Sequence, residues 1–157
     1  MRKFFIAVLM LIVLLAGCKS SVQSNKVKVI FWHGISGPLG ETLNNMISEF
    51  NKTHKDIEVI ANPISSYNAL SQKLMASIQA NNQPDIAQVY ESWTAKYIEA
   101  GVLCNLEDFM NADTTWTKDN LEDIYPVFLK SNTFNDTIYS FPFNKSVRAY
   151  FYNKDAF

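Results

Sequence analysis

Two kinds of hydrophobic pattern alternate along the chain, one with the period of a strand and one with the period of a helix. Residues 27–32 are β-branched and aromatic, and residues 56–61 alternate, as is typical of strands. Over residues 39–50 and 67–78 the apolar side chains recur every three or four positions, which predicts two amphipathic helices. Strands that alternate with helices favour an α/β fold, in which helices cover both faces of a largely parallel sheet.

The middle of the chain continues the alternation with shorter segments. Asn81, Asn82 and Pro84 are expected to stop the second helix. A third strand is then predicted over residues 85–90, and a short helix over residues 93–100 that Gly101 ends.

The last third of the chain carries weaker signals. A helix is expected over residues 121–130, interrupted or bent near Pro126. Residues 147–152 are again β-branched and aromatic, which predicts another strand, and residues 153–155 resemble the start of a helix. The chain stops there at residue 157, so we expect the sequence to be part of a longer protein.

In an open parallel sheet, ligands bind outside the carboxyl ends of the strands, where the strand order reverses. This rule selects three segments of the chain. They are Trp32–His33–Gly34 after the first strand, Tyr90–Glu91–Ser92–Trp93 after the third, and the loops on either side of residues 147–152. We therefore look for ligand-binding side chains in these segments.

The N-terminal residues indicate export. Met1, Arg2 and Lys3 precede 13 consecutive apolar residues, a run too short to span the ~30 Å of a bilayer core comfortably. Residues 1–17 therefore read as a signal peptide. The sequence Leu-Ala-Gly-Cys at its end resembles the lipobox of bacterial lipoproteins, which predicts lipidation of Cys18 and a polar tether over residues 18–26. An ordinary signal peptide followed by an incidental cysteine is the alternative.

Composition narrows the class of protein. The chain is 48% hydrophobic and 18% charged, with a formal net charge of −1, so it is neither disordered nor collagenous. No long basic patch is available for a nucleic-acid backbone, and we expect no nucleic-acid partner. With Cys18 lipidated, Cys104 is the one remaining thiol of the sequence, so an intrachain disulfide is excluded. We expect Cys104 to be a small buried apolar residue.

The candidate chemistry points to binding rather than to catalysis. The glycines at 34, 37 and 40 match neither the dinucleotide fingerprint nor a P-loop, so no nucleotide cofactor is expected. His33 and His54 are the sole histidines, and no cluster has metal-ligand spacing, so we predict no metal site. Glu91 is the acidic residue expected at a strand end, whereas a glycosidase needs two opposed carboxylates.

Aromatic residues suit a sugar ligand, because flat rings stack on the C–H faces of sugars while polar groups bind the hydroxyls. Trp32 and Trp93 lie at the ends of predicted strands and are candidates for such stacking. For Phe141, Phe143 and Phe151 the commoner role of an aromatic side chain, a place in the core, is the expectation.

These residues resemble a known family. The motifs Phe-Trp-His at 31–33, Pro-Asp-Ile at 84–86, Gln-Val-Tyr-Glu at 88–91, Pro-Phe-Asn at 142–144 and Tyr-Asn-Lys-Asp-Ala-Phe at 152–157 look like those of the extracellular solute-binding proteins, family 1, of ABC importers. The likeness is greatest to the members that bind glycerol 3-phosphate, and it covers nearly all of residues 27–157.

The resemblance implies a periplasmic-binding-protein-like clamp of two α/β lobes with the ligand between them. Residues 27–157 would be most of the N-terminal lobe, truncated before the second. Matching the family's motifs residue by residue gives Tyr67, Glu91 and Ser146 as ligand-binding residues. Residues that could also line the site are Trp32, His33, Trp93, Asn144 and Arg148.

The function implied is that of the substrate-binding component of an ABC importer, anchored by lipid at the outer face of the membrane. It would capture a polyol phosphate (glycerol 3-phosphate or a glycerophosphodiester) or a sugar and deliver it to permease subunits. Lys145 and Arg148 flank Ser146 and could favour a phosphate, Trp93 beside Glu91 suits a sugar ring, and a surface position of both cations is the alternative. An exported carbohydrate-active enzyme and a ligand-sensing receptor lipoprotein remain as alternatives.

Overall fold

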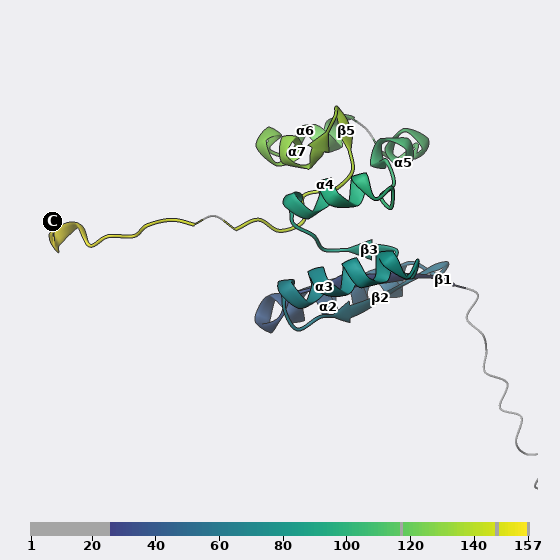
Figure 1. Ribbon diagram of the computed structural model, residues 1–157, viewed down its shortest axis with the longest axis horizontal. Helices are drawn as coiled ribbons and strands as arrows, with labels where there is room; N and C mark the ends of the chain where they lie inside the picture. The colour runs from purple at the N-terminus through teal and green to yellow at the C-terminus, as the bar shows by residue number, and fades with distance from the viewer. Residues whose placement is uncertain (1–25, 117, 147, 157) are drawn as a thin grey trace, which may run out of the picture.

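A computed structural model describes residues 26–116, 118–146 and 148–156 of the chain (Figure 1). The signal peptide expected over residues 1–17, the expected lipidation site Cys18 and residues 18–25 of the expected tether lie outside the described residues. Within the described ranges, every helix is too short or too polar to cross a lipid bilayer.

Three parallel strands form the main sheet, in the order β2-β1-β3. These are β1 (Val27–His33), β2 (Ile57–Pro63) and the two-residue β3 (Ile86–Ala87). Val27 lies opposite Ile57, and Phe31 lies opposite Ile86. The first strand among the described residues is therefore the middle strand of the sheet.

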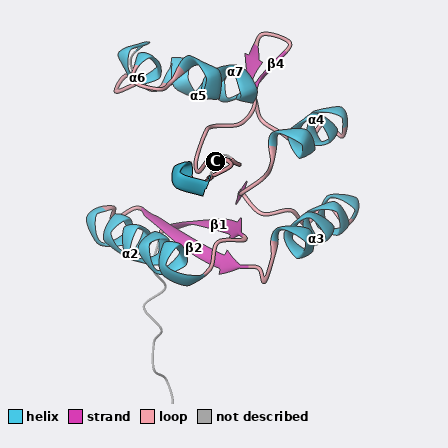
Figure 2. Ribbon diagram, turned by 90° about the vertical axis from the view of Figure 1, so that its left-hand side faces the viewer, coloured by secondary structure: helices cyan, strands magenta, loops and turns pink. Residues whose placement is uncertain are grey.

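Two helices connect these strands, α2 (Gly37–Thr53) and α3 (Tyr67–Gln79). Helix α2 contacts β2 and α3 contacts β1. The chain moves outward from β1 to β2 and then back across β1 to β3, so right-handed crossovers put the two helices on opposite faces of the sheet. Figure 2 shows α2 and α3 on either side of β1 and β2. The expected α/β fold is thus present.

The sequence predicts helix ends near residues 81 and 101. Helix α3 and the next helix, α4 (Glu91–Glu99), end at these points, and they end in the same way. Asn81 after α3 and Gly101 after α4 have φ angles of 51° and 66°. The next amide in each case donates to a carbonyl in the last helical turn, from Asn82 to Ser77 over 2.8 Å and from Val102 to Tyr97 over 3.2 Å. This is the Schellman motif, which satisfies the orphan carbonyls of a helix end.

Most of the remaining elements form a second group on the other side of β3 from α3 (Figure 1). They include the hairpin strands β4 (Thr133–Phe134) and β5 (Thr137–Ile138). The chain turns between these two strands at Asn135 and Asp136, whose positive φ angles fit a two-residue hairpin turn. Besides α4, the helical members are α5 (Leu106–Ala112), α6 (Lys118–Glu122) and α7 (Pro126–Asn132). The 3-10 turn η1 (Lys154–Ala156) lies apart from this group, close to the C-terminus (Figure 1).

Leu70, Leu74 and Tyr97 form the buried core between α3 and α4. Leu70 is fully buried, and the partly buried rings of Trp32 and Trp93 pack against this cluster. Burying a leucine side chain contributes about 1.5–3 kcal/mol, so this cluster is a main contributor to the attachment of α4 to the sheet layer.

The strand expected over residues 147–152 is wrong for the residues that the structure describes. Residues 148–152 have no strand partner, and the segment runs away from the body of the molecule (Figure 1). Tyr150 and Phe151 are essentially fully exposed, so Phe151 is not in the core. A β-branched and aromatic sequence forms a strand only where a neighbouring backbone can bond to it.

Two smaller expectations also fail. Phe141 and Phe143 are expected in the core but are exposed, and each makes a single edge contact with another ring, Phe141 with Trp116 and Phe143 with Phe31. Cys104 is exposed rather than buried. The helix start expected at residues 153–155 is present as a short 3-10 helix, with the Asn153 side chain accepting a hydrogen bond from the Asp155 amide over 2.9 Å.

Several boundaries differ from the expectation. The third strand pairs only over Ile86–Ala87, shorter than the predicted 85–90. The helix expected over residues 121–130 is two helices, because Pro126 begins α7 rather than bending one continuous helix. Helix α5 and the β4–β5 hairpin were not expected, since neither carries a long hydrophobic period.

Candidate functional site

The strand order reverses next to β1, and the carboxyl ends of β1 and β3 meet at this point. Gly34 follows β1 and Gln88 follows β3. The Gly34 amide donates to the Gln88 side-chain oxygen over 3.0 Å, and the Gln88 amide donates to the Trp32 carbonyl over 2.8 Å. The two strand ends are therefore tied together where ligands bind in folds of this type.

Gln88 is the centre of a polar network at this edge of the sheet. Its side chain is only 8% exposed. The Gln88 Nε2 group donates to the Tyr67 hydroxyl over 3.3 Å and to the Asn144 Oδ1 atom over 2.8 Å, while its Oε1 atom accepts from Gly34. A glutamine amide has two donor hydrogens and one acceptor oxygen, and here all three functions are used. We call Gly34, Tyr67, Gln88 and Asn144 the Gln88 network.

Tyr67 reaches this network because α3 begins at that residue. Ser66 caps the helix, and its hydroxyl accepts from the Ala69 amide over 3.2 Å. The Tyr67 ring lies against Gly34, where an added Cβ atom would be 3.2 Å from the ring. A side chain at position 34 would therefore press on the tyrosine, so glycine lets the ring approach the end of β1.

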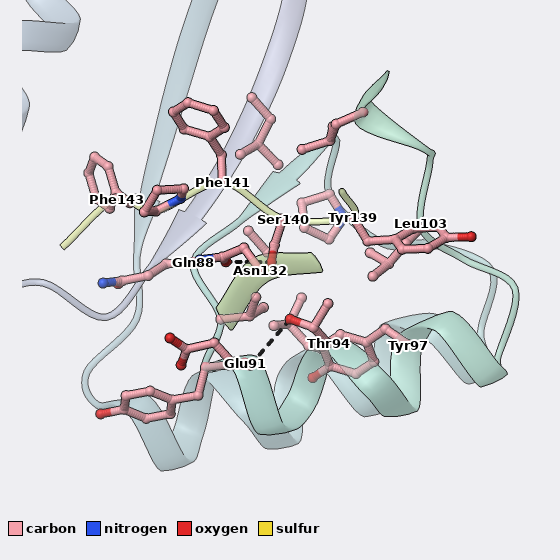
Figure 3. Close-up of a pocket in the computed structure, with 18 of the residues that line it drawn as sticks. Gln88, Glu91, Thr94, Tyr97, Leu103, Asn132, Tyr139, Ser140, Phe141 and Phe143 are labelled. Atoms are coloured by element: carbon pink, nitrogen blue, oxygen red, sulfur yellow. Dashed lines mark hydrogen bonds between the residues drawn. The ribbon is translucent and has the colours of Figure 1, made fainter. Parts of the chain in front are cut away.

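A pocket of about 670 Å³ opens beside the Gln88 network. This volume lies within the range of small-molecule sites, roughly 300–1,000 Å³. In Figure 3, Gln88 and Glu91 lie on one side of the pocket, and Tyr97, Leu103 and Tyr139 lie on the other. The polar lining residues are Tyr67, Gln83, Asp85, Gln88, Glu91, Thr94, Asn132, Ser140, Asn144, Lys145 and Ser146.

Glu91 is the first residue of α4, so its carboxylate lies at the positive end of the helix dipole. It forms an ion pair with Lys145. The Ser131 hydroxyl lies close to both, 3.5 Å from the Glu91 Oε1 atom and 3.4 Å from the Lys145 Nζ atom. Glu91 and Lys145 therefore place a carboxylate and an ammonium group side by side in the pocket, where the two charges neutralise each other.

Asn132, at the end of α7, supports the opposite wall. Its Nδ2 group donates to the Phe128 carbonyl over 2.8 Å, and its Oδ1 atom accepts from the Ser140 hydroxyl over 2.6 Å. Asn132 is 4% exposed, so these bonds fix a buried polar side chain. The result is a rigid connection between α7 and the segment that leads to Asn144.

Four of the residues singled out from the sequence line this one pocket: Tyr67, Glu91, Asn144 and Ser146. The other four do not line it. Trp32 and Trp93 pack against the core, and the Lys73 ammonium lies 4.1 Å from the centre of the Trp32 ring. Arg148 is exposed beyond the pocket-lining segment.

His33 is buried at the end of β1 and does not line the pocket. Its Nδ1 atom accepts a hydrogen bond from the Ile35 amide over 3.3 Å, and its Nε2 atom has no partner among the described residues. Burial lowers the pKa of His33 from its ordinary value. His33 is thus a neutral side chain of the protein interior.

Sequence reasoning missed Gln88 and Asn132. Gln88 carried a signal, because it is a polar residue between Ala87 and Val89 in an apolar segment, where a buried side chain needs hydrogen-bond partners. Asn132 carried none, since its role depends on a hairpin that the sequence pattern does not reveal. Among the described residues, no three His, Cys, Asp or Glu side chains are grouped so as to hold a metal ion.

Comparison with known families gives a match over residues 35–157 to the model described as bacterial extracellular solute-binding protein. The sn-glycerol-3-phosphate-binding periplasmic protein UgpB of Pectobacterium atrosepticum is 32% identical over 132 residues, covering 81% of this chain and 29% of that protein. UgpB of Escherichia coli K12 is 27% identical over 128 residues, with the same coverage of 81% and 29%. The chain thus spans under a third of the length of these relatives.

Solved structures share the fold. The cyclic alpha-maltosyl-1,6-maltose binding protein of Arthrobacter globiformis superimposes with a TM-score of 0.62 at 22% identity, covering 71% of this chain and 27% of that one. The sugar-binding protein MalE of Xanthomonas citri gives a TM-score of 0.61 at 21% identity, covering 72% and 27%. The α/β architecture is therefore that of periplasmic sugar-binding proteins.

Proposed function

Because the chain belongs to the bacterial extracellular solute-binding protein family, we propose that it acts as the substrate-binding component of an ABC importer. Its ligand is a polyol phosphate, such as glycerol 3-phosphate or a glycerophosphodiester, or a sugar. It captures this ligand outside the membrane and delivers it to permease subunits. The lipid-modified Cys18 and the signal peptide over residues 1–17 are part of this proposal.

The observation that carries the proposal is the pocket where the carboxyl ends of β1 and β3 meet. A sugar or polyol offers hydroxyl groups, each of which needs a hydrogen-bond partner when it leaves water. Glu91 accepts hydrogen bonds from these hydroxyls, and Tyr67, Asn144 and Ser146 complete the polar lining. The names of the sequence relatives support a polyol phosphate, and the titles of the structural neighbours support a sugar.

The pocket's other carboxylate supports binding over hydrolysis. Asp85 also lines the pocket, but its Oδ2 atom accepts a hydrogen bond from the Ile30 amide over 2.8 Å. It serves to hold β1 and the start of β3 together. The relatives are substrate-binding proteins rather than enzymes. We therefore propose no catalytic residue.

Calorimetry on the purified full-length protein tests the proposal, with glycerol 3-phosphate, a glycerophosphodiester and maltose as ligands. Glu91→Ala is expected to weaken binding by about 1–3 kcal/mol, because hydroxyl groups of the ligand lose their acceptor. Glu99→Ala, at an exposed position on the same helix, is the matched control. Absence of heat with all three ligands would overturn the proposed function, and unchanged affinity in Glu91→Ala would remove Glu91 from the site.

The membrane anchor has its own test. Cells that express the full chain are fed radioactive palmitate, and the Cys18→Ser variant serves as the comparison. Label and membrane association that depend on Cys18 support the anchor. Equal membrane association of the two proteins, without label, rejects it.

A further inference from the structure

Lys145 is the one cation among the described lining residues of the pocket, and the residues beside it in space are Glu91 and Ser131. Its side chain is 25% exposed and that of Glu91 is 35% exposed. Sequence position alone left open whether this lysine faces solvent or the site. The ion pair with Glu91 turns its ammonium group toward the pocket.

The Glu91–Lys145 pair still has unused hydrogen-bond donors and acceptors for a ligand. An ammonium group carries three donor hydrogens and a carboxylate has about four acceptor positions. The contacts to Ser131 and between the two charges use only some of these. An incoming molecule can therefore replace the contact between the two charges, if it supplies an anionic group for Lys145 and hydroxyls for Glu91.

We propose that Lys145 makes the pocket select its ligands by charge. Its ammonium group pairs with Glu91 until a ligand with both an anionic group and hydroxyls takes its place. This rests on the proposed function and narrows it to hydroxylated monoanions or dianions. A neutral sugar that displaces Lys145 from Glu91 leaves the ammonium group without its partner. Separating a half-buried pair in this way is costly, whereas an anionic ligand compensates both charges.

The experiment compares two ligands in the full chain. Lys145→Met, which keeps the length of the side chain and removes its charge, is expected to weaken binding of glycerol 3-phosphate about tenfold or more. A lost charge-assisted hydrogen bond has this size. The same variant is expected to bind maltose at least as tightly as the wild-type chain, because Glu91 no longer has an internal partner. Lys145→Arg is expected to retain most of the affinity for glycerol 3-phosphate.

Lys96→Met, at an exposed position on α4, is the matched control and should change neither affinity. If Lys145→Met does not fold, the double variant Glu91→Gln with Lys145→Met replaces it, since no charge is then left unpaired. Equal losses for both ligands, or no loss for glycerol 3-phosphate, would overturn the role of Lys145. If the wild-type chain binds maltose but not glycerol 3-phosphate, the proposed function stands and charge selection by Lys145 is overturned. If it binds neither ligand, both proposals are overturned.

Discussion

The Gln88 Nε2 group donates to the Asn144 Oδ1 atom over 2.8 Å, joining two residues 56 positions apart in the chain. Asn144 is otherwise part of an exposed segment with no regular secondary structure. The buried Gln88 amide thus helps to attach the segment that carries Asn144, Lys145 and Ser146 to the sheet. The shape of the pocket at this wall depends on that attachment.

Replacing Gln88 by alanine should therefore destabilise the protein and loosen the pocket. The change leaves the Gly34 amide and the Tyr67 hydroxyl without a partner, and an unsatisfied buried polar group costs about 1–3 kcal/mol. Urea unfolding of the full chain measures the loss. Gln72→Ala, at an exposed position on α3, should change stability by less than about 0.5 kcal/mol. Similar stability of both variants would contradict the role of Gln88.

His33 should make the protein less stable in acid. Its pKa is lowered in the folded state from an ordinary value of 6.5, so below that pH the unfolded chain binds a proton that the folded chain does not. The contribution of His33 is fully present above pH 6.5 and is lost as the pH falls below it. Urea unfolding at pH 7.5 and pH 5.5 should show this loss, and His33→Gln should show a smaller one. Equal pH dependence in the two proteins would refute the assignment.

Leu70→Ala should be among the most destabilising single substitutions. Leu70 has no exposed surface, and a large-to-small change at a core leucine costs about 2–5 kcal/mol. Leu39 is 69% exposed on α2, so Leu39→Ala is the matched control and should cost far less. Thermal unfolding of the two variants provides the comparison. A midpoint for Leu70→Ala close to that of Leu39→Ala would mean that the α3–α4 core contributes little.

The two Schellman ends predict changes of opposite sign. Gly101→Ala places a Cβ atom at a φ of 66°, which costs about 1–2 kcal/mol. At Asn81 the φ is 51°, and Asn81→Gly relieves the side-chain strain, so a gain of up to about 1 kcal/mol is expected. Chemical unfolding reports both values. The prediction fails if the two substitutions change stability in the same direction.

The elements with a long hydrophobic period were predictable from the sequence. Helices α2 and α3 each bury one face, and strands β1 and β2 are β-branched and lie between them, so the pattern of apolar residues predicts both their type and their position. The β4–β5 hairpin is too short to show a recognisable hydrophobic pattern. Residues 147–152 show the reverse case, since a strand-like composition does not form a strand among the described residues 148–152 without a neighbouring backbone.

The site was predictable only in part, for a related reason. Glu91 follows from the rule that ligands bind at the carboxyl ends of parallel strands, and Tyr67 and Ser146 follow from family motifs. The pairing of Glu91 with Lys145 depends on where an irregular segment crosses the sheet edge. No periodic pattern encodes such a crossing, so Lys145 could be located only in the folded structure.

The position of β1 at the centre of the sheet sets an order for folding. The first strand to be synthesised needs two neighbours, and the second of these, β3, begins only at Ile86. Closing the larger of the two loops costs more chain entropy, so the β2–β1 pair should form first and β3 should complete the sheet. Until β3 pairs with β1, one edge of β1 carries unsatisfied backbone N–H and C=O groups. A slowly folding chain is most prone to pair with a second chain at this edge.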